Sequence, residues 1–220
     1  MPTVPYAAVL FDLDGVIVDT TELHYRVWDE FGRANGFSPT RADLLATNGR
    51  PASETIRQWL GCNMPAAKVA QLTAERESSF NSLLETAPVF IVAGAAAFVT
   101  ALEKAAIPFA VATSAVRENA ILALKRVGME NRFDVIVTAN DVVRGKPDPE
   151  PYLRAAAALG IAPDQCIVIE DSVSGIRSAK AAGARCLALA TTFPREFLFA
   201  EKPDWLATNF EDIPAELRPR

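Results

Sequence analysis

One stretch near the N-terminus, residues 7–20 (AAVLFDLDGVIVDT), limits the possible fold more than any other part of the chain. Residues 7–11 are all apolar, which is typical of a strand buried on both faces of a parallel sheet. The letters DLDG follow, and the alternation of side chains along a strand lets Asp12 and Asp14 point the same way. Two such carboxylates repel each other and are costly to bury, so the chain must supply a compensating cation, either a metal ion or a lysine.

The letters DLDG also have two simpler interpretations. Aspartate and glycine are common in turns, so an isolated DxDG is often only a turn. A calcium-binding loop would need further oxygen ligands at fixed offsets and a closing glutamate. Residues 16–18 are instead Val-Ile-Val, which does not fit such a loop. The turn stays open as an alternative until the rest of the chain is considered.

Composition narrows the class of protein. The chain has 220 residues, of which 50% are hydrophobic and 22% charged, and this predicts one core-forming domain with room for an insertion. Because the net charge is −5 and no basic run occurs, we expect no nucleic acid and no membrane as partner. The N-terminus lacks the basic region of a signal peptide. Three cysteines without CxxC spacing favour a reducing compartment, so we expect a cytoplasmic protein. Nothing in the sequence suggests an obligate partner, and we expect a monomer.

Two kinds of pattern divide the chain. Residues 19–87 carry only helical patterns, at 19–35, 41–46, 53–60 and 65–87. Beyond them, strand patterns at 108–113, 133–138, 166–170, 185–190 and 204–207 alternate with helical patterns at 95–105, 117–127, 151–159 and 175–182. Such alternation is typical of a parallel sheet. We therefore predict an α/β fold, with a doubly wound, Rossmann-like core of residues 1–17 and 88–220 and an α-helical cap domain of residues 18–87.

Polar residues gather at the predicted C-terminal ends of the strands, which is where sites form in such sheets. In chain order they are Asp12, Asp14, Thr113, Ser114, Lys146, Glu170 and Asp171. A carboxylate can attack a phosphoryl group and form an aspartyl phosphate. Oxygen donors without clustered histidine or cysteine favour Mg²⁺, which can orient the nucleophile and the phosphate. This set therefore indicates a site for a metal ion and a small phosphorylated molecule.

The other groups fit further steps of the same chemistry. Thr113 offers a hydroxyl, and Ser114 and Ala115 offer amides near the start of the next helix, where phosphate binds well. Lys146 supplies a fixed positive charge for the nucleophile and the phosphate oxygens. Asp14 can protonate the leaving oxygen and later deprotonate the attacking water.

Each of these residues has a simpler alternative when it is taken alone. Thr113 and Ser114 serve as helix caps in one such interpretation, and Asp171 with Ser172 as an N-cap in another. Lys146, which stands between glycine and proline, is then only a solvated loop lysine. The coincidence of all four parts at successive strand ends favours the functional interpretation.

Four strings carry a resemblance to a known family, namely FDLDG at 11–15, VATSA at 111–115, GKPDP at 145–149 and IEDSVSGI at 169–176. With them the chain resembles the haloacid dehalogenase-like superfamily across essentially its whole length. The resemblance implies Asp12 as the nucleophile and Asp14 as the acid and base. It also implies Mg²⁺ held by Asp12, by the backbone carbonyl of Asp14 and by Asp171, with Glu170 nearby.

A helical cap after the first strand is similar to the branch that holds small-molecule phosphatases, β-phosphoglucomutases and dehalogenases. Dehalogenases of this family do not keep the second aspartate, which here is Asp14. A leaving alkoxide needs a proton and a halide does not, so Asp14 argues for phosphate ester chemistry. Hinges near residues 16–19 and 87–94 would let the cap close and exclude water.

The harder choice lies between a phosphatase and a phosphomutase. The segment TELHYRVW at 21–28 is similar to a cap helix of β-phosphoglucomutases and puts His24 at their gating position, although a partly buried helix residue is the simpler interpretation. Two departures weigh against a mutase. Ala52 stands where those enzymes have a cap arginine, with Arg50 two residues earlier, and Glu77 stands where they have a cap lysine.

We therefore predict a Mg²⁺-dependent phosphatase that hydrolyses small sugar or polyol phosphates through an aspartyl phosphate. We expect Ser114, Ala115, His24 and Arg50 to contact the substrate. Asn48 and Arg76 are further specificity candidates, and a surface ion pair is the simpler interpretation of Arg76. A β-phosphoglucomutase-like mutase is the alternative function, and a non-catalytic binding module of the same fold is the remote one.

Overall fold

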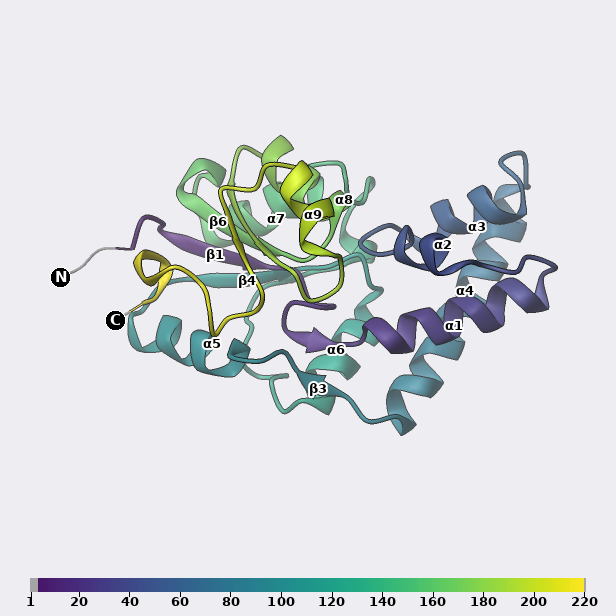
Figure 1. Cartoon of the computed structure of the whole chain (residues 1–220), viewed down its shortest axis with the longest axis horizontal. Helices are drawn as coiled ribbons and strands as arrows, with labels where there is room; N and C mark the ends of the chain where they lie inside the picture. The colour runs from purple at the N-terminus through teal and green to yellow at the C-terminus, as the bar shows by residue number, and fades with distance from the viewer. Residues whose placement is uncertain (1–3, 220) are drawn as a thin grey trace.

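The computed structural model describes residues 4–219 and shows a six-stranded sheet beside a group of helices (Figure 1). Every neighbouring pair of strands in the sheet is parallel, and the order is β5-β4-β1-β6-β7-β8. The strands are β1 (Ala8–Phe11), β4 (Phe109–Ala112), β5 (Ile136–Val137), β6 (Cys166–Glu170), β7 (Arg185–Leu189) and β8 (Trp205–Ala207). The predicted doubly wound α/β architecture is confirmed, with the first strand at the centre of the sheet.

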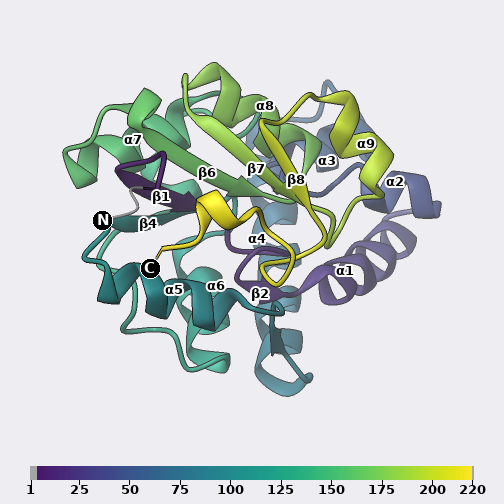
Figure 2. The ribbon, with the colours of Figure 1, turned by 60° about the vertical axis from the view of Figure 1, so that its left-hand side comes forward.

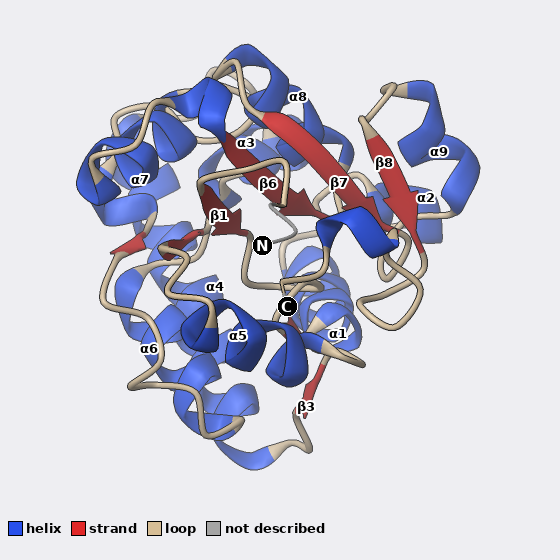
Figure 3. Ribbon diagram, turned by 90° about the vertical axis from the view of Figure 1, so that its left-hand side faces the viewer, coloured by secondary structure: helices blue, strands red, loops and turns tan. Residues whose placement is uncertain are grey.

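Strand β1 is buried on both faces because its apolar side chains meet a layer of helices on each side. Val9 and Phe11 contact the helices of one layer, and Ala8 and Leu10 contact those of the other. Figures 2 and 3 show the two layers, with α5 and α6 on one face and α7 and α8 on the opposite face. The covering helices are α5 (Ala95–Lys104), α6 (Arg117–Arg126), α7 (Glu150–Leu159) and α8 (Val173–Ala181).

The helices between β1 and the rest of the sheet have an apolar core of their own. They are α1 (Thr21–Ala34), α2 (Arg41–Leu45), α3 (Ala52–Leu60) and α4 (Ala66–Thr86), and they lie to the right of the sheet in Figure 1. Tyr25, Trp28 and Phe31 of α1 pack against Ile56 of α3 and Leu72 of α4. Helix α4 also packs on α6, so the helical group contacts the sheet-bearing part of the chain.

The two connections to the helical group run side by side. Strand β2 (Val18–Asp19) pairs with β3 (Phe90–Ile91) in antiparallel fashion, with Val18 opposite Ile91. This two-stranded ribbon was not predicted, because two residues are too short to show a strand period. Its pairing depends on segments that lie at opposite ends of the helical insertion, so no local pattern reports it.

Other differences from the sequence-based prediction are also local. The strand expected at 133–138 is limited to β5, because Phe133 turns into the core and packs edge-on against Phe11 at 6.0 Å. Helix α8 begins at Val173 rather than at residue 175, since the hydroxyl of Ser172 accepts the backbone N–H of Gly175 and caps it. A short helix, α9 (Arg195–Ala200), was not predicted. Across residues 4–219, no helix is long and apolar enough to cross a membrane.

Candidate active site

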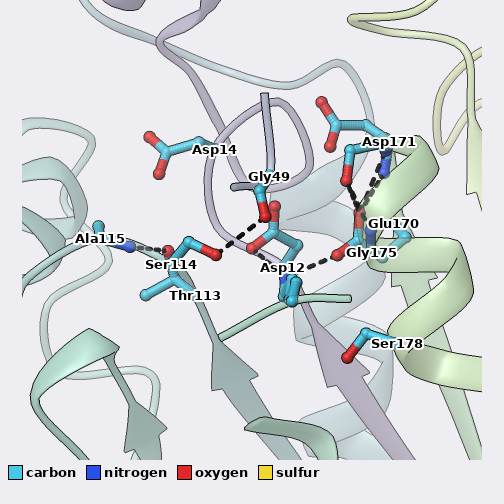
Figure 4. A network of polar contacts seen from close by, with 12 residues as sticks. Asp12, Asp14, Gly49, Thr113, Ser114, Ala115, Glu170, Asp171, Gly175 and Ser178 are labelled. Carbon is cyan, nitrogen blue, oxygen red and sulfur yellow. Dashed lines mark hydrogen bonds and ion pairs between the residues drawn. The ribbon is translucent and has the colours of Figure 1, made fainter. Parts of the chain in front are cut away.

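The candidate site lies where the carboxyl ends of β1, β4 and β6 meet. Strand β1 pairs with β4 on one side and with β6 on the other, and this brings Phe11 opposite Val111 and Ile169. The residues that follow these three, Asp12, Ala112–Thr113 and Glu170, therefore reach the same edge of the sheet. Figure 4 shows Asp12 between the Glu170–Asp171 turn and the segment from Thr113 to Ala115. The order of the strands thus assembles a polar site from distant parts of the chain.

Lys146 is fully buried and joins two carboxylates of the site. Its Nζ donates to Asp12 Oδ1 at 2.8 Å and to Glu170 Oε1 at 2.6 Å. It also lies 4.9 Å from the ring centroid of Tyr152, whose hydroxyl donates to the same Glu170 oxygen at 2.6 Å. Although burial by itself lowers it, the two carboxylates raise the pKa of Lys146 above its ordinary value. The alternative of a solvated loop lysine is therefore wrong.

Glu170 anchors both Lys146 and the turn that carries Asp171. Its second oxygen accepts the backbone N–H groups of Asp171 and Ser172 at 3.0 and 3.1 Å and the Ser172 hydroxyl at 2.9 Å. Gly175 makes room for this carboxylate, because a Cβ there would lie 1.8 Å from Glu170 Oε1. Because both oxygens of Glu170 already accept hydrogen bonds, its carboxylate positions Lys146 and the 171–172 turn rather than binding a ligand.

Asp12, Glu170 and Asp171 form the acidic group of the site. Each offers a carboxylate oxygen, and these oxygens lie within 4.8 Å of one another. Burial raises the pKa of Asp12 to about 7, with Glu170 and Asp14 adding to the rise and Lys146 opposing it. Burial, followed by Glu170 and Asp12, raises the pKa of Asp171 well above its ordinary value. Three buried carboxylates share one lysine, so a divalent cation would balance the charge.

A glycine gives the acidic group its space. Gly15 has a φ of +77°, and a Cβ there would lie 1.9 Å from Asp171 Oδ2. Any other residue would therefore be strained in its backbone and would also push the Asp171 carboxylate away. The fourth letter of DLDG is thus needed for the approach of the 170–171 turn as well as for the turn after β1.

The segment after β4 presents polar groups to Asp12. Thr113 is buried, and its Oγ1 accepts the backbone N–H of Ala115 at 3.0 Å. Ser114 Oγ donates to the backbone oxygen of Gly49 at 3.1 Å, which ties this segment to the loop before α3. Helix α6 starts only at Arg117, so Thr113 and Ser114 do not cap it, contrary to the simpler alternative.

Asp14 lies apart from the acidic group, and its carboxylate points toward the helical group instead. Its Oδ1 accepts the Thr20 hydroxyl at 2.5 Å and lies 3.3 Å from His24 Nε2. Burial by itself raises the pKa of Asp14, but His24, Thr20 and Arg76 outweigh it and hold the pKa below its ordinary value. Thr20 precedes α1, yet its hydroxyl does not cap the helix, because it donates to Asp14 instead.

Arg76 is buried beneath α1, so the surface position of the simpler interpretation is wrong, although Arg76 does form an ion pair with Glu77. Only 4% of the residue is exposed, and its guanidinium carbon lies 4.7 Å from the Trp28 ring and 5.1 Å from the Phe80 ring. Its Nη2 lies 2.6 Å from His24 Nδ1. An arginine can only donate, so Nδ1 accepts and Nε2 carries the proton that faces Asp14. His24 also stacks on Phe80 at 4.0 Å, which explains its orientation.

The helical group closes over these residues and leaves a cavity of about 60 Å³. Its walls include the predicted Asp12, Asp14, Thr113, Ser114, Ala115, His24, Arg50 and Asp171. Lys146 and Glu170 are not part of the wall; Lys146 joins Glu170 to Asp12 by donating to both carboxylates. Sequence reasoning missed Tyr152 and Asn119, which are fully buried polar partners of the site's carboxylates at 2.6 Å. Neither lies in a strand-end motif, so no local signal marked them.

Comparison with known proteins identifies the family of the chain and agrees with this geometry. The profile of haloacid dehalogenase-like hydrolases matches residues 9–189. The chain is 36% identical over 193 residues to validoxylamine A 7'-phosphate phosphatase from Streptomyces hygroscopicus subsp. limoneus, with 88% of this chain and 90% of the relative covered. It is 33% identical over 210 residues to hexitol phosphatase A from Escherichia coli, with 96% and 94% covered.

The fold agrees with these sequence relatives. The crystal structure of a HAD hydrolase, family IA, variant 3, from Entamoeba histolytica superposes on it with a TM-score of 0.86 at 30% identity, and 96% of each chain is covered. The profile match spans most of the chain, and both sequence relatives pass 30% identity over most of its length. The chain therefore belongs to the haloacid dehalogenase-like hydrolase family, as an enzyme of its phosphatase branch.

Proposed function

We propose that the protein is a Mg²⁺-dependent phosphatase that hydrolyses phosphate monoesters of small sugars or polyols through an aspartyl phosphate. The observation that carries the proposal is the position of the Asp12 carboxylate, which lies between Lys146 and the polar segment of Thr113 and Ser114 at the floor of the cavity. The names of the relatives, a phosphatase of validoxylamine A 7'-phosphate and a hexitol phosphatase, support a polyhydroxylated leaving group.

In the first step, Asp12 attacks phosphorus with the oxygen that Lys146 does not engage. A bond forms between this oxygen and phosphorus while the bond from phosphorus to the leaving oxygen breaks. Asp14 must carry a proton for this step, against the lowering of its pKa by His24, Thr20 and Arg76, and it gives that proton to the leaving oxygen, so that an alcohol departs. Water then attacks the aspartyl phosphate and Asp14 takes a proton from it. The bond between Asp12 and phosphorus breaks, and inorganic phosphate leaves.

The donor set of the site fits Mg²⁺. Asp12 and Asp171, with the backbone carbonyl of Asp14, would hold the ion, and all three offer the oxygen atoms that Mg²⁺ prefers. When bound, the ion would offset the repulsion between the Asp12 carboxylate and the phosphate. Glu170 already accepts hydrogen bonds from Lys146, Tyr152 and the turn at Asp171, so we assign it to holding the site together.

We also propose that residues 18–87 act as a cap domain on a core of residues 1–17 and 88–220. The cavity of about 60 Å³ is smaller than an engineered protein cavity of ~150 Å³ that binds benzene. A sugar phosphate is larger than benzene, so the helical group must move away to admit it. The β2–β3 ribbon joins the two parts and is the natural hinge.

The test is phosphate release from a panel of sugar and polyol phosphates, with Mg²⁺ and then with EDTA. We expect release that requires the metal and is abolished in Asp12→Asn, because the amide cannot attack phosphorus. The expected loss is at least about four orders of magnitude in kcat. Asp12→Asn should melt no earlier than the wild type, because it removes a carboxylate whose charge burial disfavours.

Two outcomes would contradict the proposal. One is a folded protein that releases no phosphate from any ester with Mg²⁺ present, which would favour a non-catalytic binding module. The other is conversion of β-glucose 1-phosphate to glucose 6-phosphate with little phosphate released, which would make the protein a mutase. A rise of the melting temperature with Mg²⁺ in the wild type, but not in Asp171→Asn, tests the metal site independently of turnover.

A further inference from the structure

The wall of the cavity that the helical group provides contains two arginines, and each already has an acidic partner. Arg50 donates to Glu54 at 3.3 Å and to Gln58 at 2.8 Å. Arg76 donates to Glu77 at 2.9 Å. The positive charges on this wall are therefore matched by negative charges, with Arg76 paired inside the protein and Arg50 paired with exposed side chains.

The pair of Arg76 and Glu77 is held in place from several sides. The Trp28 and Phe80 rings enclose the Arg76 guanidinium, which is 96% buried, so it cannot swing toward a ligand. The second oxygen of Glu77 accepts Nδ2 of Asn119 at 2.6 Å. Asn119 belongs to α6, so the carboxylate is anchored across the boundary between the helical group and the sheet-bearing part. Glu77 thus presents a fixed negative charge to the cavity.

This arrangement treats neutral and charged leaving groups differently. A second phosphate on the substrate would bring negative charge against the Glu77 carboxylate in a confined space, where the adjacent Arg76 is already paired with that carboxylate. A neutral hydroxyl can instead donate to Glu77, whose oxygens keep lone pairs beyond those used by Arg76 and Asn119.

We propose that Glu77, held by Arg76 and Asn119, is a specificity-determining residue that selects a neutral, polyhydroxylated leaving group and rejects a substrate with a second phosphate. The inference rests on the proposed phosphatase function and names the substrate class of that same site. It assigns selectivity to rejection by a fixed charge, which a binding contact alone does not provide.

The experiment compares a monophosphate that the enzyme hydrolyses with the bisphosphate of the same sugar, such as fructose 1-phosphate and fructose 1,6-bisphosphate. We expect the wild type to favour the monophosphate by at least about tenfold in kcat/KM. Glu77→Gln keeps the shape of the side chain and removes its charge. We expect it to raise kcat/KM for the bisphosphate by about tenfold, mainly by lowering KM, and so to reduce the ratio of kcat/KM between the monophosphate and the bisphosphate. Glu75→Gln removes an exposed charge from the same helix and should leave the ratio unchanged.

A second variant separates charge from closure of the helical group. Asn119→Ala removes one of the two anchors but leaves the Glu77 carboxylate paired with Arg76, so the charge stays at the cavity; we expect both substrates to be affected alike and the preference to be preserved. The inference is overturned if Glu77→Gln leaves the ratio of kcat/KM for the two substrates unchanged. It is also overturned if Asn119→Ala abolishes the preference for the monophosphate as completely as Glu77→Gln does.

Hydrolysis of p-nitrophenyl phosphate by every variant distinguishes the two levels of the argument. If the wild type hydrolyses this ester and the sugar monophosphate while Glu77→Gln shows the wild-type ratio, only the selectivity inference fails. If the folded wild type hydrolyses neither with Mg²⁺, the proposed function fails and the inference fails with it.

Discussion

Lys146 is the residue on which the buried charges of the site depend. Its ammonium group balances Asp12 and Glu170 without contact with water. Replacement by methionine would keep most of the volume and leave two buried carboxylates unpaired. Breaking a buried ion pair from one side costs about 3–5 kcal/mol.

We therefore expect Lys146→Met to lower the free energy of unfolding by about 3–5 kcal/mol, measured by urea denaturation in EDTA. Lys125→Met, at an exposed position of α6, is the matched control and should change it by less than about 0.5 kcal/mol. A loss for Lys146→Met as small as that of the control would show that the carboxylates are neutralised in another way.

At the scale of single elements, the first turn of α8 must leave space for the Glu170 carboxylate. Alanine is usually better than glycine inside a helix by about 1 kcal/mol. At Gly175, however, a Cβ would lie 1.8 Å from Glu170 Oε1, and both carboxylate oxygens are already engaged. The usual sign of the substitution should therefore reverse.

We expect Gly175→Ala to destabilise the protein by about 1–3 kcal/mol, as overpacking does, and to reduce turnover by displacing Glu170 from Lys146. Thermal unfolding and phosphate release measure the two effects. Ser79→Ala, on the exposed face of α4, serves as a control and should be neutral or slightly stabilising. Stabilisation by Gly175→Ala would contradict the packing argument.

The loop that carries Lys146 is tied to the start of α7 by Glu150. Its carboxylate accepts the backbone N–H groups of Arg144 at 2.9 Å and Val143 at 3.1 Å, and Arg154 donates to it at 2.8 Å. The hydrogen bonds from Arg144 and Val143, followed by Arg154, lower the pKa of Glu150 to about 2. The stabilising contribution is therefore complete above the unfolded pKa of about 4.5 and is lost as the pH falls toward the folded value.

We expect Glu150→Gln to be less stable than the wild type at pH 6, with a difference that shrinks as the pH falls from about 5 to about 3. Denaturant midpoints across this range measure it. Glu118→Gln, at an exposed position in the first turn of α6, provides the comparison. If the difference in stability between Glu150→Gln and the wild type stays constant with pH, the ionised Glu150 carboxylate is not the cause of the stabilisation.

At the scale of the whole molecule, the loop before α3 seals the cavity by touching the sheet-bearing part directly. Gly49 has a φ of +71°, and a Cβ there would lie 2.3 Å from Ser172 Oγ and 2.4 Å from Ser174 Oγ. Its carbonyl accepts Ser114. Only glycine lets this loop come so close, so its replacement should hold the helical group away from the candidate site.

We expect Gly49→Ala to lower kcat/KM for a sugar phosphate by at least about tenfold, because misplacement of about 1 Å costs up to about a hundredfold. Gly36 has a similar φ of +80° but no atom within 4 Å of an added Cβ, so Gly36→Ala controls for backbone strain. Both variants should lose about 1–2 kcal/mol of stability. Equal kcat/KM in the two variants would show that the approach of Gly49 does not govern closure.

Particular residues show how much of the candidate site could be predicted from the sequence. Asp12, Lys146 and Asp171 were placed together because each follows a strand of a parallel sheet, and the ends of such strands share one edge. For Arg76 the sequence left a specificity role and a surface ion pair open, and it did not indicate burial, which comes from contacts with Trp28 and Phe80. Asn119 and Tyr152 were missed because their acidic partners come from other elements.

The sequence by itself determined the layered α/β fold and the strand-end residues of the site, because a strand buried on two faces and the motif after it are both encoded locally. The tertiary structure alone decided that Lys146 is buried, that β2 pairs with β3, and that Arg76, Glu77 and Asn119 form one wall. These features depend on contacts between residues far apart in the chain, where packing and charge pairing in three dimensions outweigh local preference.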